Sequence, residues 1–91
     1  MSGYVLRTNG SREALKAKPN LAELQRLVGG WIERVKVQVD GELADMIVNE
    51  EGRLRNLPLN REASILYWTG RLTADPIVGD AVVLLGPWLL K

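Results

Sequence analysis

A pair of β-prone segments joined by Asp40-Gly41 constrains the fold more than any other feature. Before the turn, residues 31–39 alternate, with Val35, Val37 and Val39 on one face and Arg34, Lys36 and Gln38 on the other. A period of two predicts a half-buried strand. Asp-Gly is a strong signal for a two-residue hairpin turn. Residues 43–48 are more continuously apolar and predict the returning strand.

A helix is predicted over residues 21–28. Asn20 is a good N-cap, and Glu23 follows at the spacing of a capping box. One apolar face results from residues that recur at helical spacing: Leu21, Leu24, Leu27 and Val28. Gly29-Gly30 predicts the end of this helix.

Other segments are shorter. Residues 4–8 predict a first strand, and residues 81–85 predict a buried last strand. The polar residues 12–18 fit a helical turn or a loop. Residues 53–59 fit a short strand that Pro58 would hold at an edge.

The segment Arg61–Trp68 leaves two readings open. Asn60 is a second N-cap candidate and favours a short helix. A strand is equally compatible with this segment, because β-branched and aromatic residues favour strands and it contains Ile65, Tyr67 and Trp68.

These elements predict an α+β fold in one domain over residues 1–91, too short for a second core. We expect an antiparallel sheet of about four strands with one or two helices on one face. The ferredoxin-like order β-α-β-β-α-β satisfies this pattern. Residues 1–18 are the least defined strand and loop, and residues 87–91 form an apolar C-terminal tail.

The composition of the chain argues against several classes of function. The net charge of +1 argues against a nucleic-acid binder, which needs a basic surface. The chain has no cysteine and no histidine, so it lacks a thiolate nucleophile and the commonest metal ligand. We therefore expect no catalytic residue, no metal and no cofactor; an enzyme that uses only carboxylates is the weakest alternative. Without a signal peptide or a spanning apolar run, a cytoplasmic protein of a bacterial cell is expected.

Two adjoining groups of side chains are candidate ligand contacts. Asn49-Glu50-Glu51-Gly52 offers an amide and two carboxylates, although the same residues suit a tight turn with Gly52 left-handed. The second group could grip a phosphate or another anion, because guanidinium groups bind such ligands with two hydrogen bonds. It comprises Arg53, Arg55, Asn60 and Arg61.

The stretches NEEG, LPLN and IVGD resemble a family of small domains of unknown function that is common in bacteriophages and in bacteria carrying mobile elements. The likeness extends from Leu21 to Gly86. It implies a phage or mobile-element origin and a cytoplasmic setting. It brings no activity and no catalytic residue.

The apolar tail gives a third candidate site. Trp88, Leu89 and Leu90 follow the stop signal Gly86-Pro87, and such an end either folds back or is buried in a neighbouring subunit. A homo-oligomer is therefore expected. We favour a non-enzymatic module that self-associates and docks on a host or phage protein. The alternative is a protein that binds or sequesters an anionic small molecule or nucleotide.

Overall fold

A computed structural model describes residues 2–73 and 75–90. Its elements run in the order β1 (Gly3–Leu6), β2 (Arg12–Ala14), α1 (Leu21–Val28), β3 (Ile32–Val39), β4 (Glu42–Asn49), α2 (Arg61–Trp68), β5 (Ala81–Leu85) and the 3-10 turn η1 (Gly86–Trp88). The expected α+β class is confirmed.

All strands belong to one five-stranded antiparallel sheet in the order β2-β1-β5-β4-β3. The expected number of about four strands was low by one. The extra strand is β2, which occupies part of the polar segment that sequence assigned to a helical turn or loop. It is exposed and too short for a periodicity signal; its register on β1 places Val5 opposite Glu13. At the other end of the sheet, β3 is an edge strand.

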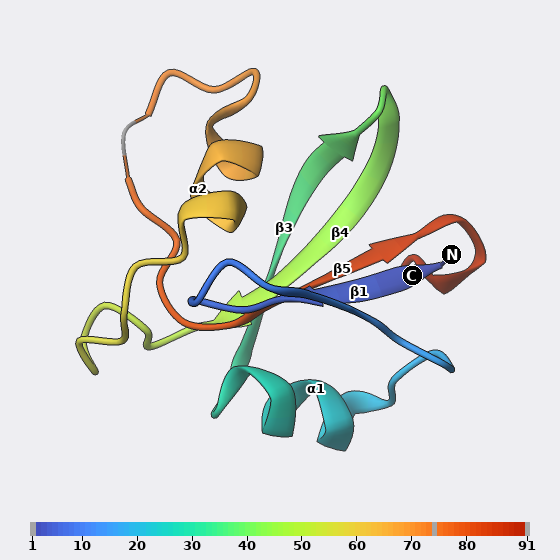
Figure 1. The fold of residues 1–91 in the computed structure, drawn as a ribbon, viewed down its shortest axis with the longest axis horizontal. Coiled ribbons are helices and arrows are strands. Elements are labelled where there is room, and N and C mark those ends of the chain that lie inside the picture. The colour runs from blue at the N-terminus through green and yellow to red at the C-terminus, as the bar shows by residue number, and fades with distance from the viewer. Residues whose placement is uncertain (1, 74, 91) are drawn as a thin grey trace.

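The helices cover opposite faces of this sheet (Figure 1). Leu24 and Val28 of α1 pack on Val5, Ile47 and their neighbours. Ala63 of α2 belongs to the cluster on the other face. The expectation that both helices lie on one face was wrong, so the arrangement is not ferredoxin-like. Apart from the added β2, the elements follow the expected order β-α-β-β-α-β.

The reason is visible in the central strands. All four residues of β1 are buried, and so are the first four of β5. A strand that is apolar on both sides needs a cover on both sides. One helix therefore serves each face, and the continuous apolar runs were the signal for it.

Local sequence explains several boundaries. At α1, the predicted capping box is present, with Glu23 N–H donating to Asn20 Oδ1 at 2.9 Å. The hairpin between β3 and β4 turns at Asp40 and Gly41, both with positive φ. Two successive left-handed residues are the requirement of a type I′ turn. Both predictions are confirmed.

The two ambiguous segments are also resolved. Arg61–Trp68 is a helix, started by Asn60, whose side chain accepts a hydrogen bond from Ala63 N–H. Residues 53–59 are not the expected short strand. They form turns, and Leu59 alone pairs with Val78 in an isolated bridge.

Candidate binding site

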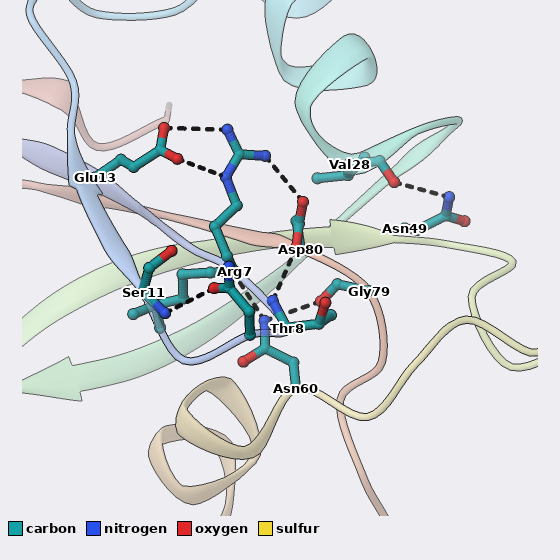
Figure 2. Close-up of polar contacts among 11 residues, drawn as sticks. Arg7, Thr8, Ser11, Glu13, Val28, Asn49, Asn60, Gly79 and Asp80 are labelled. Carbon is teal, nitrogen blue, oxygen red and sulfur yellow. Dashed lines mark hydrogen bonds and ion pairs between the residues drawn. The ribbon is translucent and has the colours of Figure 1, made fainter.

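The acidic turn after β4 is built around Asn49, whose side chain is buried. Its Nδ2 donates to Val28 O at 3.1 Å and so caps the end of α1 (Figure 2). Its Oδ1 accepts from Glu51 N–H at 2.8 Å, which closes an Asx turn. Both ends of the amide are thus occupied by the protein itself.

Gly52 in that turn is buried but not left-handed, contrary to expectation; the left-handed residue of this loop is Asn56, with φ 53°. Glycine is needed at 52 because a Cβ would lie 2.8 Å from Val78 Cγ2. The loop therefore approaches the segment before β5 too closely for a side chain. Arg55 anchors the same loop by donating to Gly29 O at 2.6 Å.

Asn60 is fully buried and also serves the fold. Its Nδ2 donates to Leu6 O and to Gly79 O, each at 2.9 Å (Figure 2). Its Oδ1 accepts from Ala63 N–H at 3.1 Å. One side chain thereby ties β1, the start of α2 and the approach to β5 together, and no polar atom of it is left for a ligand.

Asp80 forms the second tie, which sequence reasoning did not find. Arg7 Nη1 donates to its Oδ2 at 2.8 Å and Thr8 N–H to its Oδ1 at 2.9 Å (Figure 2). Arg7 also makes two bonds of 3.1 Å to Glu13 on β2. The bonds to Glu13 and then to Asp80 raise the pKa of Arg7, and Arg7 lowers the pKa of Glu13. No local sequence signal pairs residues this far apart.

The motif segments therefore meet in space, and we call residues 49–60 with 77–80 the motif junction. Gly79 N–H donates to Pro58 O at 2.7 Å, and Asn60 N–H donates to Ile77 O at 2.9 Å. The junction locks the end of β4, the start of α2 and the start of β5 together. Its buried members are structural residues.

The exposed candidates do not converge on one point. Glu50 and Arg53 line a cavity together with part of Asn49. Glu51, Arg55 and Arg61 lie outside it, and Arg53 pairs at 3.5 Å with Asp75. The structure therefore does not assemble the predicted arginines into one anion site.

The cavity has a volume of about 320 Å³ and opens on the α2 side of the sheet, beside the edge strand β3. Glu33 and Val35 of β3 contribute to it, and Tyr67 of α2 lies at its wall. The other lining residues come from the end of β4, the loop after it and the segment before β5: Val48, Asn49, Glu50, Gly52, Arg53, Leu54, Pro76, Ile77 and Val78.

The backbone of β3 presents hydrogen-bonding groups to the outside. The two-residue turn makes Val39 and Glu42 a hydrogen-bonded pair, so alternate residues back along β3 bond to β4. The residues between them direct N–H and C=O away from the sheet; they are Ile32, Arg34, Lys36 and Gln38. Arg71 supports this assignment of outward-facing residues, because its guanidinium donates to Lys36 O from outside the sheet.

The C-terminal tail folds back on its own chain. Trp88 and Leu90 are half-buried against the α1-side cluster. Leu90 N–H donates to Asp45 Oδ2 at 2.7 Å. Asp45 is fully buried, and its Oδ1 forms an ion pair with Lys36 Nζ at 2.8 Å but makes no hydrogen bond within the described residues. Leu89 is also half-buried, and Lys91 lies outside the described residues.

Within residues 2–73 and 75–90, no cluster of acidic side chains has the arrangement of a metal site. No helix in the same residues has the length and apolar character needed to cross a bilayer.

A profile of the domain of unknown function DUF3846 matches residues 1–87 of the chain. The chain belongs to the DUF3846 family. This confirms the resemblance to a family of domains of unknown function, over a longer span than the motifs suggested. No curated protein and no solved structure shows significant similarity to the chain. In this DUF3846 chain the motif segments coincide with the motif junction.

Proposed function

We propose that this domain is a non-enzymatic interaction module that docks on a host or phage protein by accepting an extended segment along β3. Strand addition to a sheet edge uses main-chain hydrogen bonds for affinity and pockets beside the edge for specificity. The edge and the pocket occur together here. The observation that carries the proposal is that Glu33 and Val35 of the edge strand are also walls of the 320 Å³ cavity.

The edge is long for an unprotected one. All eight residues of β3 lack a partner strand on the outer side, since β3 is last in the sheet order. Natural edges are usually shortened, bent or covered, because they otherwise pair with other chains. In the described part of the chain, Arg71 is the one side chain that bonds to this edge, and it occupies a single carbonyl.

Origin and self-association are part of the same proposal. The motif resemblance supports a phage or mobile-element accessory protein in the cytoplasm. Self-association through Trp88, Leu89 and Leu90 is supported by their apolar character, but much of that surface already covers the α1 side. Native mass spectrometry of the purified protein measures the oligomeric state directly.

The cavity also supports a second candidate, a small-molecule binder. Its lining charges are Glu33, Glu50 and Arg53, and Arg53 is already paired with Asp75. A neutral or cationic ligand fits this lining better than the anion that the arginines suggested. A retained mass that disappears on denaturation would support this candidate.

Selection from a displayed library of random linear peptides tests the docking proposal. Arg34 is the position to change, because its N–H points away from β4 and its loss breaks no bond of the sheet. Arg34→Pro and Arg34→Ala both remove the side chain, but only Pro removes the N–H and restricts the strand. Peptides selected on the native protein should bind Arg34→Ala and fail on Arg34→Pro.

Equal binding to both variants would contradict docking at β3. Circular dichroism must first show that both variants are folded. If Arg34→Pro does not fold, protection of the outward amides of the native protein by the same peptides decides the question.

A further inference from the structure

On the α1 side of the β3 edge, Arg34 carries a positive charge that no described carboxylate pairs. Its Nη1 donates to Leu90 O at 3.3 Å, and it has no carboxylate partner within the described residues. Lys36 on the same side already neutralises the buried Asp45 at 2.8 Å. Within residues 2–73 and 75–90, Arg34 is therefore the β3 cation on this side that forms no ion pair.

On the α2 side, the net charge of the cavity lining has the opposite sign, because Glu33 and Glu50 outnumber Arg53. Glu33 lies at the cavity wall with Glu50, and neither forms an ion pair in the described part of the chain. The cavity walls also include apolar side chains, among them Val35 and Leu54. A side chain with a long aliphatic stem and a cationic end suits such a lining.

A second copy of β3 does not match these charges. Directly opposed residues of an antiparallel pair share a face, so a two-fold pair joins even-numbered residues to even-numbered ones. The two registers with the largest overlap set Arg34 against Lys36, or Lys36 against itself. Like charges directly opposite each other destabilise a pair.

From these charges we infer the sequence chemistry of the partner strand, an inference that rests on the proposed function. The partner pairs antiparallel with β3, as all strands of this sheet do. It reads apolar–acidic–basic from its N-terminus. The acidic residue lies opposite Arg34, the apolar residue opposite Val35, and the basic residue opposite Glu33 with its side chain in the cavity.

A charge exchange between protein and peptide tests this order. Peptides selected on the native protein should contain apolar–acidic–basic. They should bind Arg34→Glu about tenfold more weakly, and changing their acidic residue to Lys should restore that loss. Arg34→Gln should give a smaller loss. Added salt should shrink the difference between the native protein and Arg34→Glu.

The outcomes separate the two claims. Peptides that need the N–H of Arg34 but lack this charge order, and bind Arg34→Glu equally well, overturn the inference and leave docking at β3 in place. Peptides that do not distinguish Arg34→Ala from Arg34→Pro overturn the docking itself. A native dimer that Arg34→Pro converts to monomer would assign the edge to a second copy and overturn the inference.

Discussion

Asn60 shows how one side chain can look like a ligand contact in sequence and be structural in the fold. An asparagine close to arginines is a reasonable anion contact, and it is also a common N-cap. Its burial decides between these roles. Three hydrogen bonds to separate parts of the backbone leave it no capacity for a ligand.

Replacing Asn60 should therefore damage stability. Asn60→Ala removes one hydrogen bond each from Leu6 O and Gly79 O and leaves Ala63 N–H without its cap, which should lower the free energy of unfolding by about 3 kcal/mol. Asn20→Ala is the matched control, since it removes an exposed N-cap and should cost about 1 kcal/mol. Urea unfolding measures both. Similar losses for the two variants would show that the buried bonds add nothing.

The sequence predicted the contacts of residues whose partners are close in the chain. The capping box of Asn20 and Glu23 and the turn at Asp40-Gly41 are local, so both were predictable. The pairing of Arg7 with Asp80 joins opposite ends of the chain and was not. The sequence marked Gly52 as a turn residue, but glycine is required there because Val78 leaves no room for a side chain.

At the scale of elements, β2 depends on a charge contact more than on apolar burial. Its three residues are exposed, and Glu13 bonds twice to Arg7. This exposure explains why no hydrophobic pattern in the sequence predicted β2. The helix α2 was ambiguous because its residues also suit a strand. The N-cap Asn60 and the packing of α2 on the sheet favour the helix.

Acid should weaken the attachment of β2. Arg7 lowers the pKa of Glu13 below its ordinary value of 4.5, so the unfolded chain binds this proton first as the pH falls. The stabilisation is present above 4.5 and is lost as the pH falls through the lower, folded value. The stability difference between the native protein and Glu13→Gln should be measurable at neutral pH and vanish in acid. A difference that is independent of pH would contradict the role of this pair.

At the scale of the whole molecule, the buried polar side chains of the motif junction are structural, and the proposed docking surface adjoins the junction along the edge of β3. The motif junction holds the elements together, and the side chains of Asn49, Asn60 and Asp80 are hydrogen-bonded within the protein. The outer side of β3 has no partner strand, and the cavity beside it is lined partly by junction residues such as Glu50, Arg53 and Ile77. Sequence placed its candidate site in the junction because distinctive residues gather there. The edge was not predictable, because the position of a strand in the sheet depends on all its long-range partners.

Amide hydrogen exchange, with and without a selected peptide, tests this division most directly. In the free protein, Val35 and Val37 should exchange slowly, because they pair with β4, whereas Arg34 and Lys36 should exchange quickly. Bound peptide should slow the amides of Arg34 and Lys36 by at least about tenfold. Residues 55–57, which lie outside the cavity, should be unchanged. Protection confined to residues 50–57, with the β3 amides unaffected, would place the binding site in the motif junction and contradict the account.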